Sequence, residues 1–255
     1  MAVYKKKGYK KEKKNSEAAN ILAKDSTTAE VFTSLDEGAS RIEKFIEKNQ
    51  KWIFAGLLAI VVAVAGYMWY DSNIKQPKEQ EGVDNMSKAQ FYFNQALTET
   101  DEDTKKVDFD KALNGADGKF GFKQIAEKYS GTKAGNLANY YIGVIAYNNN
   151  DFKEAVANLS KFDADDDVLQ PAAYGLIGDA FMQLNQPKDA LSYYEKAAKF
   201  SDNSFTAPMY YFKAGRVALQ LGDKSKAKKY FQIIKDKYES AAEAKDIDVF
   251  LAEAE

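Results

Sequence analysis

The hydrophobic and polar positions of this chain fall into three stretches. Residues 1–51 are mainly polar, residues 52–70 are almost entirely apolar, and residues 71–255 carry apolar positions that recur at helical spacing. Recurrence every three to four residues is the pattern of helices that bury one face. We therefore predict an all-α protein in which a single N-terminal transmembrane helix is followed by an α-solenoid of helical repeats.

The apolar stretch reads WIFAGLLAIVVAVAGYMWY and holds nineteen residues without a charge or an amide side chain. At 1.5 Å per residue it forms roughly 28 Å of helix, close to the roughly 30 Å hydrocarbon core of a bilayer. Trp52 lies at one end and Tyr67, Trp69 and Tyr70 at the other, where aromatic rings favour the lipid-water boundary. The stretch 52–70 predicts a transmembrane helix.

Two other interpretations of this stretch fit it less well. A buried helix of a soluble core seldom carries so long an uncharged run with aromatic ends. A cleaved signal peptide would use Ala63-Val64-Ala65 as its cleavage site, but the run exceeds the usual length and follows fifty residues rather than a short basic segment. Ala55, Ala59 and Ala63 share one face, which either packs against another helix or reflects ordinary small-residue content.

Basic residues around the stretch predict its orientation. Four directly precede it and two follow closely, namely Arg41, Lys44, Lys48 and Lys51 before it and Lys75 and Lys78 after it. Lysine and arginine beside a span favour the cytoplasmic side. The N-terminus should therefore be cytoplasmic, with residues 71–255 on the other side of the membrane.

The segment before the span divides into a helix and a tail. Residues 34–51 predict an amphipathic juxtamembrane helix, because Ser34 and Glu37 form a capping box ahead of an apolar stripe. The stripe can lie on the inner leaflet or pack on a partner. Residues 1–33 predict a basic, largely disordered cytoplasmic tail. Residues 1–51 have a net charge of +4, from twelve basic and eight acidic residues, whereas the whole chain has −2.

After a predicted polar linker at 71–86, the chain repeats itself. Three glycines are spaced by 35 and 37 residues, and an alanine follows each at an offset of twelve: Gly143, Gly178 and Gly215, then Ala155, Ala190 and Ala227. The best unit, YGLIGDAFMQLNQPKDALSYYEKAA, resembles the tetratricopeptide repeat, whose two helices need small residues where they cross. The resemblance implies a tetratricopeptide-repeat domain over residues 87–255.

The ends of this domain are less regular. FKQIAEKY resembles the later FQIIKDKY, so residues 119–129 should form the second helix of an earlier repeat whose first helix lies near residues 87–97. The connection at 98–118 is too long for a repeat turn, and either a functional loop or an atypical terminal repeat explains it. SAAEAKDIDVFLAEAE predicts a C-terminal capping helix.

Composition excludes most enzyme sites. The chain contains no cysteine and no histidine, so disulfides, Cys/His zinc sites and triads or dyads that use these residues are excluded. NGADGKFG lacks the spacing and the Ser or Thr of a phosphate loop. DADDDV alternates aspartates as calcium loops do, but Val168 replaces the required glycine. We expect no enzyme, no cofactor, no metal and no catalytic residue.

The groove of tetratricopeptide domains is lined by the first helix of each repeat. The pattern carries over here to Tyr140, Val144, Tyr147, Asp179, Met182, Phe212, Arg216 and Leu219. These aromatic and apolar side chains with a few charges suit extended or helical peptide segments. The Lys and Asn set that clamps a C-terminal carboxylate in other such domains is missing.

The whole arrangement resembles the YfgM family, ancillary subunits of the bacterial Sec translocon, and ALNGADGKFGFKQIAEKYSGTKAGNLANYYIG resembles its Bacteroidota type. The resemblance implies a single-pass protein of the bacterial inner membrane with a periplasmic repeat domain. It implies as partners the SecYEG channel, a PpiD-like membrane-anchored prolyl isomerase and chaperone, and secreted client polypeptides. The alternative is a periplasmic scaffold for another envelope assembly or stress-signalling complex.

The N-terminal tail offers a second kind of contact. Seven lysines lie within its first fourteen residues, namely Lys5, Lys6, Lys7, Lys10, Lys11, Lys13 and Lys14. Beside a membrane each contributes about 1 kcal/mol of attraction to anionic lipid. If the translocon resemblance holds, ribosomal RNA of a docked ribosome is the other polyanion that these lysines would meet.

Overall fold

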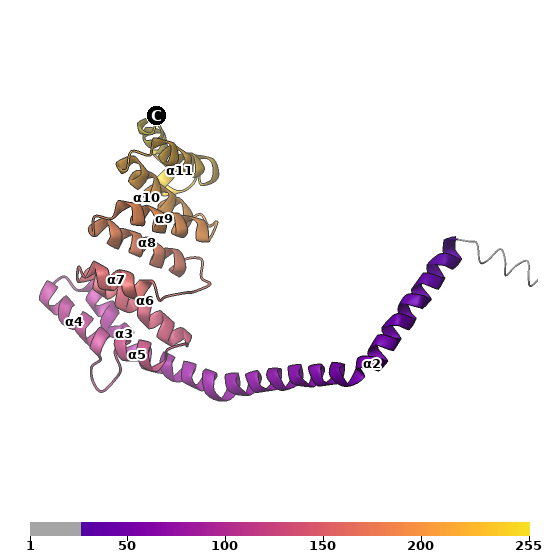
Figure 1. The fold of residues 1–255 in the computed structure, drawn as a ribbon. Coiled ribbons are helices and arrows are strands. Elements are labelled where there is room, and N and C mark those ends of the chain that lie inside the picture. The colour runs from indigo at the N-terminus through magenta and orange to yellow at the C-terminus, as the bar shows by residue number, and fades with distance from the viewer. Residues whose placement is uncertain (1–26) are drawn as a thin grey trace, which may run out of the picture. The chain divides into compact units, whose positions relative to one another are not determined.

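A computed structural model describes the backbone of residues 27–255 and the side chains of residues 43–255. The described part consists of helices joined by turns and contains no strand, as the sequence predicts. The chain divides after Trp69 into an N-terminal unit and a C-terminal unit, Tyr70–Glu255 (Figure 1).

The described part of the N-terminal unit is a single long helix, α2 (Thr27–Tyr70). It joins the predicted juxtamembrane helix to the predicted span without a break. It also begins seven residues before Ser34, which corrects the predicted tail, because residues 27–33 are helical rather than disordered. This segment contains neither glycine nor proline, so nothing in it ends the helix. The seven tail lysines lie outside the described residues.

The apolar half of α2 is exposed throughout. Trp52 is 80% exposed and Leu58 65%, values that are unfavourable for large apolar side chains in water. Among the described residues, one helix is long and apolar enough to cross a membrane. Ala55, Ala59 and Ala63 are likewise exposed, and their role in helix packing stays a prediction.

Residues 71–86 are helical, which corrects the predicted polar linker. A π-helical turn, η1 (Asp71–Lys75), leads into α3 (Gln76–Thr98). Pro77 lies just after this turn, and its missing N–H interrupts the helical hydrogen bonds where the π-helical turn passes into α3. The buried face of α3 begins at Gly82, where an added Cβ would lie 2.8 Å from the Cβ of Ala134. Between residues 71 and 86 only Gly82 and Met86 are buried, so this part of the sequence is mostly polar and resembles a linker.

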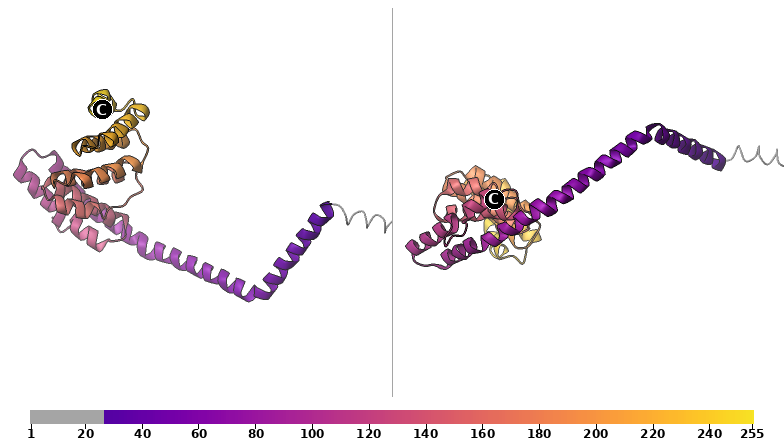
Figure 2. Two further views of the ribbon diagram at one scale, coloured as in Figure 1. Left: turned by 45° about the horizontal axis from the view of Figure 1, so that its top comes forward. Right: turned by 90° about the horizontal axis from the view of Figure 1, so that it is seen from below.

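The C-terminal unit stacks its helices in pairs along one direction, as Figures 1 and 2 show. After α3 the helices are α4 (Glu102–Asn114), α5 (Phe122–Lys128), α6 (Lys133–Asn148), α7 (Phe152–Leu159), α8 (Leu169–Gln183), α9 (Pro187–Phe200), α10 (Thr206–Gln220), α11 (Lys224–Lys237), the 3-10 turn η2 (Ala242–Ala244) and α12 (Ile247–Glu253). This is the α-solenoid that the repeat pattern predicts.

The long connection at 98–118 contains an additional helix, α4. Asp101 caps it by accepting a hydrogen bond from the Thr104 backbone N–H at 2.9 Å. Phe109 of α4 is buried and packs on Phe93 of α3, with ring centroids 6.0 Å apart. Of the two alternatives for this connection, the structure therefore supports an atypical terminal repeat, which consists of α3, α4 and α5.

The repeated glycines lie where the two helices of a repeat cross. An ideal Cβ on Gly143 would lie 2.5 Å from Cγ of Leu159, and one on Gly178 would lie 2.6 Å from Cε1 of Tyr194. An ideal Cβ on Gly215 would lie 2.4 Å from Cε1 of Phe231. The three repeated alanines are fully buried beside these crossings: Ala155, Ala190 and Ala227. The small-residue pattern therefore marks close approach of the helix backbones.

The turn inside each repeat also recurs at the same spacing. Asn150, Asn185 and Gly222 have positive φ angles of 62°, 57° and 78°, a conformation that asparagine and glycine tolerate best. The residue after each of them donates its backbone N–H to the preceding helix at 2.8 to 2.9 Å. Each turn thereby satisfies a carbonyl at the helix end and starts the second helix.

Candidate functional site

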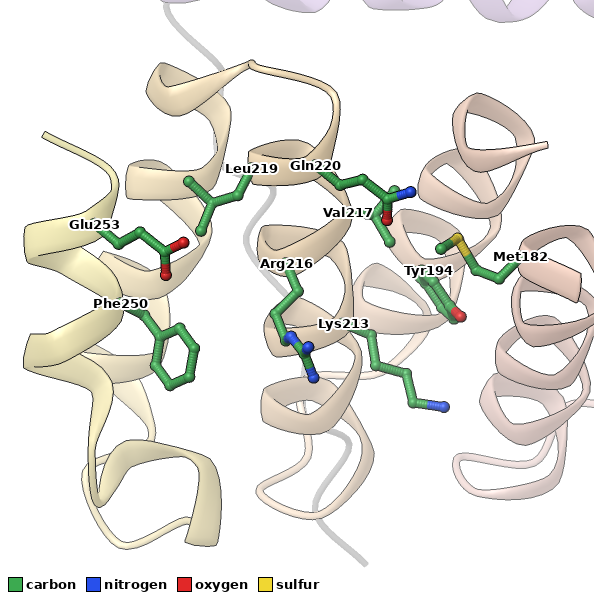
Figure 3. Close-up of a pocket in the computed structure, with 9 residues that line it drawn as sticks. All are labelled: Met182, Tyr194, Lys213, Arg216, Val217, Leu219, Gln220, Phe250 and Glu253. Carbon is green, nitrogen blue, oxygen red and sulfur yellow. The ribbon is translucent and has the colours of Figure 1, made fainter. Parts of the chain in front are cut away.

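A cavity of about 580 Å³ opens among the first helices of the last repeats (Figure 3). Helix α10 contributes most of its lining, α8 and α9 one residue each, and α12 two. The lining residues are Met182, Tyr194, Lys213, Arg216, Val217, Leu219, Gln220, Phe250 and Glu253. We call this cavity the groove.

Helical spacing places the α10 side chains of the groove together. Lys213, Arg216, Val217 and Gln220 are three or four residues apart, so they lie on one face of the helix. The closing helix α12 follows α11 as the first helix of a further repeat would. Phe250 of α12 is thereby brought to the groove.

A charged network joins three helices at the edge of the groove. The Tyr194 hydroxyl of α9 donates to Oδ1 of Asp179 in α8 at 2.6 Å. The Lys213 ammonium of α10 donates to both oxygens of the same carboxylate at 2.8 Å. Burial, together with the hydrogen bond to Asp179, raises the pKa of Tyr194 well above its ordinary value of 10.0. Lys213 is therefore neutralised within the protein.

Arg216 differs from Lys213 in having no internal partner. Its side chain is exposed, and it forms no ion pair with any described residue. Met182, Val217 and Phe250 provide apolar surface around it. The groove therefore offers a ligand both apolar contacts and one guanidinium that is free to pair with a carboxylate.

The structure brings together some of the predicted groove residues. Met182, Arg216 and Leu219 line the cavity, and Asp179 adjoins it through Tyr194. The other four do not line the cavity and pack on neighbouring side chains: Tyr140 on Phe162, Tyr147 on Phe152, Phe212 on the groove residue Phe250, and Val144 against the buried cluster around α3 and α6. Aromatic residues at groove positions here serve mainly to pack neighbouring helices.

Sequence reasoning missed several residues that line the groove, among them Lys213, Val217, Gln220, Phe250 and Glu253. The first three follow from the helical spacing of Arg216. Phe250 and Glu253 lie on α12, which the sequence predicts only as a capping helix. Their spacing gives no sign that this helix also lines the groove. In the described part of the chain, no group of three or more acidic, His or Cys side chains is arranged to hold a metal ion.

Comparison with protein families agrees with this geometry. Models described as tetratricopeptide repeat match residues 171–204 and 210–241. The two matches coincide with the pairs α8–α9 and α10–α11, which flank the groove. No curated protein matches the chain. Residues 171–204 and 210–241 are therefore tetratricopeptide repeats, and repeats of this class generally mediate protein–protein interactions.

Replacing Asp179 by alanine should lower the free energy of unfolding by about 2 kcal/mol, because the half-buried Lys213 and the buried Tyr194 lose their shared acceptor. Chemical denaturation of the full chain, followed by circular dichroism, measures the change. Asp189→Ala, on the exposed side of α9, is the matched control and should change stability by less than about 0.5 kcal/mol. Equal losses in the two variants would contradict the role of the network.

Proposed function

We propose that this protein is a non-enzymatic, membrane-anchored ancillary subunit of the Sec protein translocon. The groove binds segments of partner chaperones or of secreted proteins as they emerge. The observation that carries the proposal is the groove itself, a cavity with apolar and charged lining that includes the unpaired guanidinium of Arg216. It lies in a unit of tetratricopeptide repeats, and the same chain contains an exposed apolar helix.

The chemistry of the groove supports peptide binding. Its volume of about 580 Å³ lies in the range of pockets that hold a few side chains or a small ligand. Apolar walls retain aliphatic or aromatic anchors of a helical or extended segment, and a charged group orients that segment. Arg216 fulfils this second task because its charge is not used inside the protein.

The apolar part of α2 supports a location in the membrane, where the repeat unit can meet a protein channel. Four basic residues precede the apolar helix closely and fewer follow it, which supports a cytoplasmic N-terminus and a periplasmic repeat unit. The resemblance to the YfgM family supplies the proposed partners, namely SecYEG, a PpiD-like membrane-anchored prolyl isomerase and secreted clients. On this proposal the lysine-rich tail lies at the cytoplasmic face, against anionic lipid or a docked ribosome.

Purification of the tagged full-length protein in mild detergent tests the proposal. We expect mass spectrometry to find channel subunits together with a membrane-anchored prolyl isomerase. Arg216→Glu should reduce recovery of the groove-bound partner about tenfold, since it replaces an attraction by a repulsion. The matched control is Lys229→Glu, the same reversal at an exposed position of α11, and it should leave recovery unchanged.

Two results would count against the proposal. A preparation that contains no channel subunit would remove the translocon role, and recovery of a different envelope complex would establish the alternative of a scaffold for another assembly. Equal recovery with Arg216→Glu and Lys229→Glu would place the contact outside the groove.

A further inference from the structure

Two loops that are distant in the sequence lie side by side at one edge of the solenoid. The aspartate loop (residues 163–167) joins α7 to α8, and the phenylalanine loop (residues 201–205) joins α9 to α10 (Figure 1). The Asn203 amide donates to the backbone carbonyl of Asp167 at 2.9 Å, and the Thr206 hydroxyl donates to the same carbonyl at 3.4 Å. The two loops therefore form one surface, which we call the loop face.

The loop face exposes large apolar side chains. Phe205 is 70% exposed and Val168 is 46% exposed. Leu169 and Phe200, the residues at the adjoining helix ends, are each 37% exposed. Neighbouring exposed apolar side chains of this size are typical of surfaces that bind another molecule.

The exposed phenylalanine is held in place by its neighbour. Oδ1 of Asn203 accepts hydrogen bonds from the backbone N–H groups of Phe205 and Thr206 at 2.9 and 2.6 Å. The same side chain ties this loop to the aspartate loop. The backbone that carries Phe205 is thus fixed at the start of α10, so binding at this position requires little ordering of the chain.

The surroundings of these apolar residues are acidic. The aspartate loop contains four aspartates, and there is no lysine or arginine between Lys161 and Lys188. Asp202, in the other loop, pairs with Lys237, whereas none of the four forms an ion pair with a described residue. Hydrogen bonds from the backbone of Leu169 and Val168 lower the pKa of Asp166, so it stays charged at neutral pH.

We propose that the loop face is a second protein-binding surface, and that it binds a partner segment that carries lysine or arginine beside an aromatic or branched apolar residue. The apolar residue of the partner packs on Phe205 and Val168, and its cations face the unpaired carboxylates. The groove differs, because it presents the unpaired guanidinium of Arg216 together with the carboxylate of Glu253. The loop face therefore selects a different segment, and this inference does not depend on the translocon proposal.

Fluorescence anisotropy with labelled peptides tests the proposal, using the full chain in nanodiscs of uncharged lipid. The probe is the peptide GKKFLKKG, with GEEFLEEG and GKKSSKKG as charge-reversed and apolar-free comparisons. We expect GKKFLKKG to bind saturably and at least about tenfold more tightly than either comparison. Raised salt should weaken its binding, because the carboxylates are exposed to solvent.

Variants locate the binding site. Phe205→Ser and the double change Asp165→Asn with Asp167→Asn should each weaken binding of GKKFLKKG about tenfold. Val249→Ser removes an apolar residue of comparable exposure on α12 and should have no effect. Phe205, Asp165, Asp167 and Val249 are all exposed, so circular dichroism should confirm that each variant is folded. If Phe205→Ser does not fold, the double aspartate variant tests the proposal.

Several results would overturn the proposal. These are the absence of saturable binding, equal affinity for the three peptides, or affinity that the loop variants leave unchanged. Analytical ultracentrifugation of the full chain tests whether a second copy of this chain occupies the loop face. A dimer that Phe205→Ser dissociates would show that a second copy covers the loop face, and would replace the partner segment proposed here.

Discussion

Replacing Gly143 by valine should lower the free energy of unfolding of the C-terminal unit by about 3 kcal/mol. An ideal Cβ at this position would lie 2.5 Å from Cγ and 3.1 Å from the backbone nitrogen of Leu159. The side chain of Leu159 can move only in part, because it is 1% exposed and packed in the core, and the backbone nitrogen cannot move without displacing α7. Valine would therefore separate the two helices of this repeat.

Hydrogen exchange of the full chain can show which helices lose stability in Gly143→Val. Each repeat of a solenoid contacts mainly its neighbours, so protection should fall most in α6 and α7 and least in α11. Ala157→Val adds bulk to the exposed side of α7 and should change stability by less than about 0.5 kcal/mol. Uniform loss of protection along the solenoid, or no loss at all, would contradict the role of Gly143 at the helix crossing.

Stability should also fall steeply when the pH rises above about 10. Tyr194 and Tyr210 are only 3% and 5% exposed, and burial raises the pKa of both hydroxyls above the ordinary value of 10.0, with Asp179 adding to the effect. Above that pH the unfolded chain releases protons that the folded chain retains. The stabilisation is fully present below pH 10, and each tyrosine should remove about 1.4 kcal/mol per pH unit beyond it.

Urea denaturation at a series of pH values from about 9 to 12 measures this slope, and phenolate absorbance reports the ionisation itself. Tyr194→Phe should reduce the slope by about 1.4 kcal/mol per pH unit while retaining the Lys213–Asp179 pair. At neutral pH the same variant should lose only about 1 kcal/mol, the value of one hydrogen bond. Stability that stays constant across this range would exclude a role for the buried tyrosines.

The candidate site shows how far sequence reasoning extends. Met182, Arg216 and Leu219 were assigned to the groove because repeat positions determine which side of a first helix faces it. Tyr140 and Tyr147 occupy equivalent positions but pack on aromatic neighbours. Periodicity identifies a helix face, but it does not show whether a neighbouring side chain covers that face.

The sequence by itself determined the parts of this protein whose signals are local or periodic. The uncharged run of nineteen residues predicts a helix that can span a membrane, because its centre is apolar and its aromatic ends favour the lipid-water boundary. The paired spacing of Gly143 and Gly178 with Ala155 and Ala190 predicts the solenoid, because two helices can cross closely only at small residues. Asn150 and Asn185 recur with that spacing, and the structure shows that each allows the turn between helices.

Only the tertiary structure decided the features that join distant segments. The helix at 71–86 depends on the packing of Gly82 against α6, the groove includes Phe250 because α12 folds back beside α10, and the loop face depends on the hydrogen bond from Asn203 to Asp167. The physical reason is common to the three cases. Each feature is stabilised by contacts between residues tens of positions apart, whose closeness is set by the stacking of the repeats and not by the sequence around either residue.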